Sequence, residues 1–175
     1  MKRMLTIALL LAAFILAPSS LARAQQAKKE YLTTLEADKI RDAEDPALRI
    51  KLFIGFAADR LKKFQYELAR PSSERLRGER LNSLLNAYAS CVDDAAELID
   101  LGRKRQDDIR AGIKEIQTKV KEFMPQLEKL AAEGKDLALY KETLVDAIEA
   151  TKQAREDADK AAKEIAPAPV RRKPS

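Results

Sequence analysis

The sequence of 175 residues contains no histidine. Histidine is the usual base of hydrolytic triads, a ligand of most zinc sites and part of the Glu-x-x-His pairs of di-iron bundles, so these kinds of site are excluded. The sequence also lacks a glycine-rich phosphate loop, a G-x-S-x-G turn and a C-x-x-C pair. We therefore predict that the protein is not an enzyme and has no catalytic residue, metal ligand or cofactor.

Cysteine, glycine and tryptophan are also scarce, with one, five and none in the chain. Few glycines and a 35% share of charged residues are typical of a helical domain. The single cysteine, Cys91, cannot form a disulfide within its own chain. It is either a small side chain packed beside the core, as free cysteines commonly are, or an intermolecular thiol that joins two chains.

The first apolar run, at 4–16, is too short to span a bilayer comfortably. Lys2 and Arg3 precede it, and Ala22-Arg23-Ala24 supplies the small residues that signal peptidases recognise. We predict a signal peptide over 1–24, cleavage before Gln25, and a periplasmic or secreted protein with no transmembrane segment after cleavage. An uncleaved membrane anchor is the alternative.

The net charge of +5 does not describe the part of the chain that we expect to fold. Six cations lie in the signal peptide or in a proline-rich, basic tail over 166–175 that we expect to be disordered: Lys2, Arg3, Arg23, Arg171, Arg172 and Lys173. Without these six, residues 25–170 carry a net charge of −1. A nucleic-acid binder needs a basic face, so we expect no nucleic-acid partner.

A long apolar stripe organises the chain, with steps alternating between four and three residues. Its members are Leu81, Leu85, Tyr88, Val92, Ala95, Ile99, Gly102, Gln106, Ile109, Ile113, Ile116, Val120, Phe123, Leu127 and Leu130. A period near 3.5 predicts a helix wound against a partner helix. Because Gly102 and Gln106 keep the phase, we expect one long helix over 73–132 with a polar middle and a kink at Pro125. A turn at 102–106, giving one more helix, is the alternative.

Two capping signals precede this stripe. Thr33 and Glu36 match a capping box and predict a short helix that ends near Ala43. Asp45 followed by Pro46 predicts the start of a second helix that extends to about residue 69.

A reversal and a last helix follow the stripe. Gly134 is expected to end the long helix in the left-handed conformation, and Asp136 to cap a last helix over 137–165. We predict flexible residues at 25–31 and then one all-α domain over 32–165. Its fold is an extended antiparallel bundle or hairpin of three long helices plus one short N-terminal helix, with coiled-coil-like packing.

The apolar residues of the second helix and of the stripe supply a candidate interaction face. Its members are Phe53, Phe56, Phe64, Ile109, Ile113 and Ile116. An aromatic stripe on one helix most often belongs to the core, and a binding groove is the alternative.

Two charged clusters are further candidates. Asp93, Asp94, Glu97 and Asp100 could hold a divalent cation weakly, but we interpret them as a solvated patch in which Asp100 pairs with Lys104. Basic residues near the turn at Pro71 could give peripheral contact with anionic envelope components such as lipid head groups. These residues are Arg60, Lys62, Lys63, Arg70, Arg75, Arg77 and Arg80.

The stretch Leu32-Thr33-Thr34-Leu35-Glu36 resembles the L-T-x-x-Q motif of the Spy and CpxP type of periplasmic helical chaperones. Glu36 replaces the glutamine, and no second copy of the motif occurs. The stretch over 36–68 is also similar to exported bacterial helical proteins described only as hypothetical. The first resemblance implies an exported, wholly helical fold, and the second implies no activity.

We therefore predict an exported, non-enzymatic helical protein that binds a protein partner or self-associates in the cell envelope. The alternative is a periplasmic holdase-type chaperone, which binds unfolded clients on an apolar helical face. The two readings differ in their surface, because a holdase must leave part of the stripe or of the Phe53 face accessible.

Overall fold

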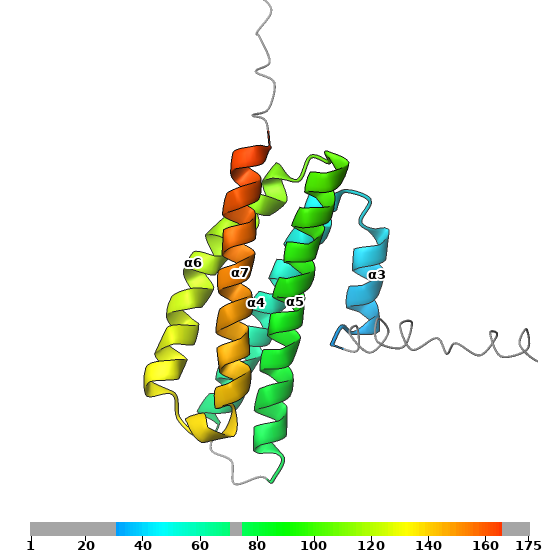
Figure 1. The fold of residues 1–175 in the computed structure, drawn as a ribbon. Helices are drawn as coiled ribbons and strands as arrows, with labels where there is room; N and C mark the ends of the chain where they lie inside the picture. Colours follow the sequence, from blue (N-terminus) through cyan, green and yellow to red (C-terminus); the bar gives the residue numbers. More distant parts are fainter. Residues whose placement is uncertain (1–30, 71–74, 166–175) are drawn as a thin grey trace, which may run out of the picture. The chain divides into compact units, whose positions relative to one another are not determined.

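The computed structural model describes residues 31–70 and 75–165, which belong to one unit that begins at Tyr31. Within these ranges the chain forms five α-helices and one 3-10 helix and contains no strand, so the all-α prediction is confirmed (Figure 1). The predicted signal peptide, most of the predicted flexible segment and the basic tail lie outside the described residues.

Both N-terminal capping signals act as predicted. Helix α3 (Thr34–Asp42) follows Thr33, whose hydroxyl accepts a hydrogen bond from the Glu36 amide while the Glu36 carboxylate accepts one from the Thr33 amide. Helix α4 (Pro46–Ala69) follows Asp45, whose carboxylate accepts a hydrogen bond from the Ala47 amide at 2.9 Å. Pro46 occupies the first helical position, where a missing N–H leaves no carbonyl unpaired.

The region predicted as one long helix is two helices, α5 (Arg77–Arg105) and α6 (Arg110–Glu133). The described residues therefore contain four long helices, and the prediction of three is wrong. Gln106 ends α5 with a left-handed φ of 60°. The amides of Gln106 and Asp107 bond to the carbonyls of Arg103 and Gly102 at 3.3 and 2.9 Å. This is a Schellman motif, which satisfies the last carbonyls of a helix and usually has glycine at the left-handed position.

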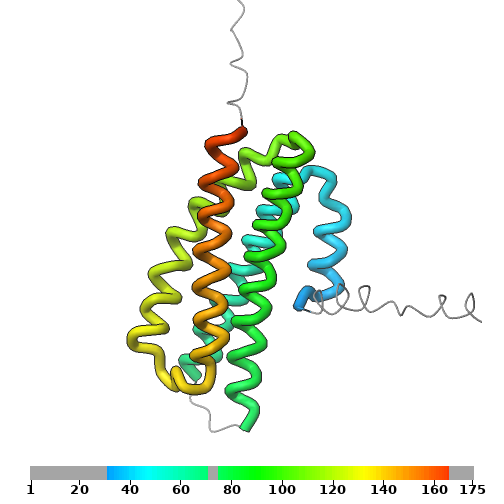
Figure 2. The backbone as a smooth tube through the Cα atoms, viewed as in Figure 1, coloured from blue at the N-terminus to red at the C-terminus, as the bar shows by residue number. Residues whose placement is uncertain are grey.

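The stripe keeps its phase because α5 and α6 line the same core. Each of them packs on α4 and on α7 (Lys141–Glu164), whereas the backbones of α5 and α6 approach each other closely at few positions. The two helices thus lie diagonally across the bundle, and Figure 2 shows the backbone reversing between them. Gly102, in the last turn of α5, has no room for a side chain, because a Cβ atom there would be 2.5 Å from Cγ2 of Ile109.

Buried aromatic side chains connect the helices across the core. The rings of Tyr88 on α5 and Phe123 on α6 lie 5.6 Å apart, and those of Phe64 on α4 and Tyr140 lie 5.1 Å apart. The Tyr88 hydroxyl lies 2.7 Å from Oγ1 of Thr151 on α7, so both buried polar groups are satisfied. The prediction that the aromatic face of α4 is core is confirmed for Phe53 and Phe64, which are 5% and 0% exposed.

The reversal after α6 differs from the prediction. Gly134 ends α6 with a φ of −64°, and the left-handed residue is Asp136, with a φ of 55°. A Cβ atom at Gly134 would clash with the Tyr140 hydroxyl, so the glycine serves close approach rather than a special φ. Asp136 caps no helix and precedes the 3-10 helix η1 (Leu137–Leu139), so the last α-helix begins later than predicted.

Two glycines give a matched test of how α4 and α6 pack. Replacing Gly112 by alanine places a Cβ atom 2.9 Å from Cβ of Ile50, which cannot move without its helix. Gly55 has nothing within 4 Å of the same position. Alanine at Gly55 is expected to stabilise the chain by about 0.5 to 1 kcal/mol, the usual gain inside a helix. Alanine at Gly112 is expected to destabilise it by roughly 1 to 3 kcal/mol, the usual effect of overpacking. Urea unfolding of both variants measures the difference, and equal stabilisation would contradict the close approach.

Candidate functional site

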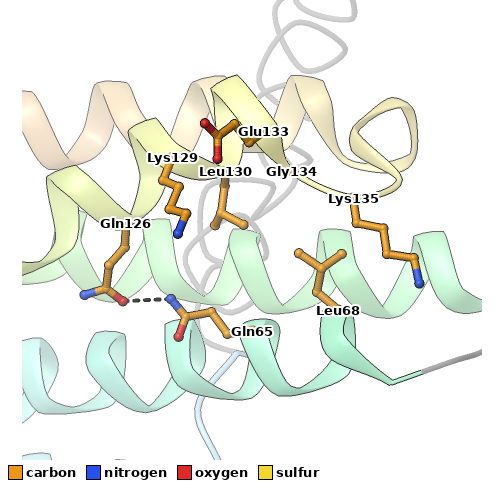
Figure 3. A pocket seen from close by; sticks show the side chains of 8 residues that line it. All are labelled: Gln65, Leu68, Gln126, Lys129, Leu130, Glu133, Gly134 and Lys135. Atoms are coloured by element: carbon orange, nitrogen blue, oxygen red, sulfur yellow. Dashed lines mark hydrogen bonds between the residues drawn. The ribbon is translucent and has the colours of Figure 1, made fainter.

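An open cleft lies where the C-terminal halves of α4 and α6 separate. Its volume is about 400 Å³, within the range of small ligand sites. Eight residues line it: Gln65, Leu68, Gln126, Lys129, Leu130, Glu133, Gly134 and Lys135. Figure 3 shows Lys129 and Leu130 extending from α6 toward α4, with Leu68 on the α4 side.

One hydrogen-bonded pair closes an end of this cleft. Nε2 of Gln65 donates to Oε1 of Gln126 at 2.7 Å, and Nε2 of Gln126 donates to the Glu122 carbonyl at 2.6 Å. This chain of bonds holds the amides in place. Leu68 and the partly buried Leu130 give the remaining cleft an apolar floor.

The charged groups of the cleft are cationic in sum. Lys129 and Lys135 outnumber Glu133. An apolar floor between two cations suits an apolar group that carries a negative charge.

A second polar site lies between α3 and the bundle, and we call it the Arg60 clasp: Tyr31, Glu36, Asp59, Arg60 and Asp94. The Arg60 side chain is buried, and its Nη1 and Nη2 donate to the two Glu36 oxygens at 2.7 and 2.5 Å. Arg60 also donates to the Asp59 carboxylate at 3.0 Å and to the Tyr31 carbonyl at 3.1 Å. The Tyr31 hydroxyl donates to Asp94 on α5. The clasp therefore joins the α3 segment to both α4 and α5.

The clasp also sets the protonation of its members. Hydrogen bonds from Arg60 lower the pKa of Glu36 to about 2, and Glu36 in turn raises the pKa of Arg60. Burial, aided by the hydrogen bond to Asp94, raises the pKa of Tyr31. Burial also raises the pKa of the nearby Cys91 thiol to about 12. At neutral pH the clasp holds two ion pairs, from Arg60 to Glu36 and from Arg60 to Asp59, while the thiol is neutral and therefore a poor nucleophile.

The lowered pKa of Glu36 predicts a loss of stability in acid. The unfolded chain binds a proton near the ordinary pKa of 4.5, whereas the folded chain resists protonation down to about 2. The stabilisation is thus fully present above pH 4.5 and is lost as the pH falls toward 2. Because solvent lies near this carboxylate, we expect a loss of roughly 1 to 2 kcal/mol between pH 6 and pH 3. Urea unfolding at both values checks it, with Glu36→Gln as the control. An equal acid loss in the two proteins would contradict the assignment to Glu36.

The predicted interaction face is inside the bundle. Phe53, Phe64, Ile109, Ile113 and Ile116 are each 5% exposed or less. Phe56 is partly exposed and packs against the core. The described fold therefore does not present these six side chains as a surface, and a partner would reach them only if the bundle opened.

The other predicted site residues are also placed. Cys91 is fully buried, as in the first of the two alternatives for this thiol, so a link to a second chain would require its exposure. Of the acidic cluster, Asp94 belongs to the clasp, and Asp100 pairs with Lys104 at 2.5 Å, as predicted for that pair. No group of three or more potential metal ligands lies together in the part of the chain that the structure describes.

Two members of the predicted basic surface are buried instead. Arg60 lies in the clasp, and Arg77 at 4% exposure donates to the carbonyls of Leu68 and Arg70 at 2.8 and 2.7 Å. Arg77 thereby satisfies the last turn of α4 from the start of α5. The basic surface near the turn is consequently smaller than the sequence suggests.

Neither the cleft nor the clasp is predictable from local sequence patterns. Glu36 forms the predicted capping box, and nothing local shows that the same carboxylate also binds Arg60, 24 residues away. One sequence feature does indicate that Arg60 is buried. Arg60 lies three residues after Ala57 and next to Leu61, and both of these residues belong to the buried face of α4. The cleft depends on how far α4 and α6 separate, which no residue pattern encodes.

Comparison with known proteins gives no further guide. No family model, no curated protein and no solved structure matches this chain. Among the described helices, none is both long and apolar enough to cross a membrane. A functional conclusion must therefore rest on the geometry of the two sites.

Proposed function

We propose that this chain is an exported, non-enzymatic helical protein that binds a protein partner in the cell envelope. The cleft between α4 and α6 would receive an acidic, apolar segment of that partner. The observation that carries this proposal is the position of Leu68 and Leu130 beside the ammonium groups of Lys129 and Lys135. Desolvation of the leucines contributes affinity, and the two cations select for carboxylates.

The use of the core supports a binding role over a holdase role. A holdase would bind clients on the stripe or on the Phe53 face. Both are buried where α4, α5, α6 and α7 pack together. With coiled-coil-like packing of these helices, the bundle would act as a rigid scaffold for the cleft. A preformed site on a rigid scaffold favours one partner over many unfolded clients.

Site-specific photo-crosslinking in bacterial cells tests the cleft. A photoreactive residue replaces Glu133, an exposed residue that lines the cleft and is neither of the two cations, or Lys152, an exposed residue on α7 outside it. We expect one dominant protein adduct from position 133 and none of the same mass from position 152. Adding Lys129→Glu is expected to reduce that adduct at least tenfold, because it reverses one cation of the cleft.

The result has a clear contrary outcome. Identical adducts from both positions, or an adduct that Lys129→Glu leaves unchanged, would overturn the cleft as the binding site. Many adducts of varied mass from both positions would instead favour the holdase reading.

Export is tested separately from binding. The protein recovered from the envelope or medium of expressing cells is expected to begin at Gln25, which intact-mass measurement detects. Recovery in the cytoplasm with residues 1–24 still attached would contradict export and leave the cleft experiment unaffected.

A further inference from the structure

Helix α3 is attached to the bundle in an unusual way for a helix. None of its residues is buried, and the chain that leads from it to α4 consists of Ala43, Glu44 and Asp45, with Nε of Arg49 donating to the Ala43 carbonyl at 2.6 Å. Tyr31, Leu32 and Ile40 are only partly buried against the core. The attachment therefore depends on the Arg60 clasp more than on apolar burial, which is the usual source of helix docking.

The surface under the clasp recognises a defined pattern. Arg60 binds the Glu36 carboxylate with two hydrogen bonds, and Asp94 on α5 accepts one from the Tyr31 hydroxyl. The site thus requires a carboxylate five residues after a tyrosine. A two-bond arginine–carboxylate pair is directional as well as strong, so it fixes the register of whatever segment binds there.

The link between α3 and α4 is extended at Ala43 and at Asp45. Asp45 precedes Pro46, and a residue before proline is disfavoured in the helical conformation. Opening the link therefore leaves three extended residues, which span roughly 10 Å. Because these three residues lie outside α4, the α3 segment can leave the α4–α5 face of its own chain without unfolding α4.

We infer that the α4–α5 face around Arg60 and Asp94 is a docking surface for the α3 segment of a second copy of this chain, so that two copies assemble by exchanging α3. Each clasp contact forms equally well within one chain or between two. The balance is then set by strain in the three-residue link and by protein concentration, as for other exchanged elements. This assembly does not involve the α4–α6 cleft.

Charge reversal distinguishes exchange from attachment within one chain. In Glu36→Arg two arginines face each other within the chain, and in Arg60→Glu two glutamates do. In an exchanged mixed dimer both clasps regain opposite charges: the native Glu36 meets the native Arg60, and the introduced arginine meets the introduced glutamate. We expect each variant alone to be monomeric by light scattering and native mass spectrometry. An equimolar mixture is expected to contain at least tenfold more dimer, all of it mixed.

The control is the double variant Glu36→Arg, Arg60→Glu in one chain. It restores opposite charges within the chain, whereas exchange with the native protein would place like charges in both clasps. The double variant and the native protein are therefore expected to form no more mixed dimer than either single variant forms alone. Circular dichroism establishes that each variant is folded. A mixture of folded single variants that stays monomeric would overturn the inference, as would a dimer that forms equally from either variant alone.

A second experiment decides the matter if Arg60→Glu does not fold. Deleting the exposed Glu44 shortens the link and strains attachment within one chain, while inserting Gly-Ser after Glu44 relaxes it. With the clasp intact in both, the shortened chain is expected to show at least tenfold more dimer than the lengthened one at the same concentration. Equal masses for the two chains would overturn the inference. If crosslinking at position 133 fails while exchange occurs, only the proposed cleft function is lost.

Discussion

Ile113→Asp is expected to unfold the bundle rather than to alter a binding surface. Ile113 is 4% exposed and belongs to the apolar core cluster, so an introduced carboxylate would be buried among apolar side chains. Burial of an unpaired charge, together with loss of the packed side chain, is among the largest single-residue effects, at about 4 kcal/mol or more. For a chain with the usual stability of about 5 to 15 kcal/mol, this removes most of the folded population in the less stable cases.

The measurement is circular dichroism with thermal unfolding, and the matched control is Val145→Asp. Val145 lies on α7 with 53% of its surface exposed, so its substitution is expected to change stability by less than about 0.5 kcal/mol. A folded Ile113→Asp protein with native helicity would show that the α6 stripe is accessible after all. That result would return the holdase reading to consideration.

Arg77→Met is expected to have the second largest effect and to lower the free energy of unfolding by roughly 3 kcal/mol. Each charge-assisted hydrogen bond contributes about 1.5 to 3 kcal/mol, and partial relaxation of the variant recovers part of their sum. Methionine keeps most of the apolar stem but makes none of these bonds. The carbonyls of Leu68 and Arg70 would lose their donor, and Asp136 would lose its partner at 3.2 Å. One side chain thus holds together the end of α4, the start of α5 and the turn after α6.

Arg155→Met is the matched control, at an exposed position on α7. Arg155 pairs with Asp159 at 3.8 Å and both side chains are about half exposed, so its loss is expected to be below about 1 kcal/mol, as for surface ion pairs. Urea unfolding of the two variants gives the comparison. Equal losses would contradict a structural role for Arg77. Among the described residues the buried Nε of Arg77 has no hydrogen-bond partner, which lowers the stability of the native protein. The comparison therefore tests whether the bonds of the two Nη atoms outweigh this cost.

Local patterns correctly predicted those features that a few neighbouring residues determine. Thr33 with Glu36 and Asp45 with Pro46 set the starts of α3 and α4, because capping depends on contacts within one turn. The apolar faces of α4, α5 and α6 were also predictable, since helical periodicity alone decides which side chains share a face.

The break between α5 and α6 was not predictable from the stripe. Two helices on opposite sides of one core can show the same continuous phase as one helix, and Gln106 replaces the glycine that usually marks such an end. The left-handed residue after α6 is similarly Asp136 instead of Gly134, where a Cβ atom would clash with the Leu130 carbonyl oxygen and the Tyr140 hydroxyl oxygen. In both reversals a residue other than glycine adopts the left-handed conformation, so the glycine rule misplaces the end of the helix.

By itself the sequence determined that the described chain is helical, which apolar faces its helices bury and where α3 and α4 begin. Only the tertiary structure decided that Arg60 and Arg77 are internal, that Glu36 anchors α3, and that a cationic cleft opens between α4 and α6. The physical reason is range. Helix formation and capping depend on neighbours within one or two turns, whereas these sites join residues that are 9 to 70 positions apart in the chain.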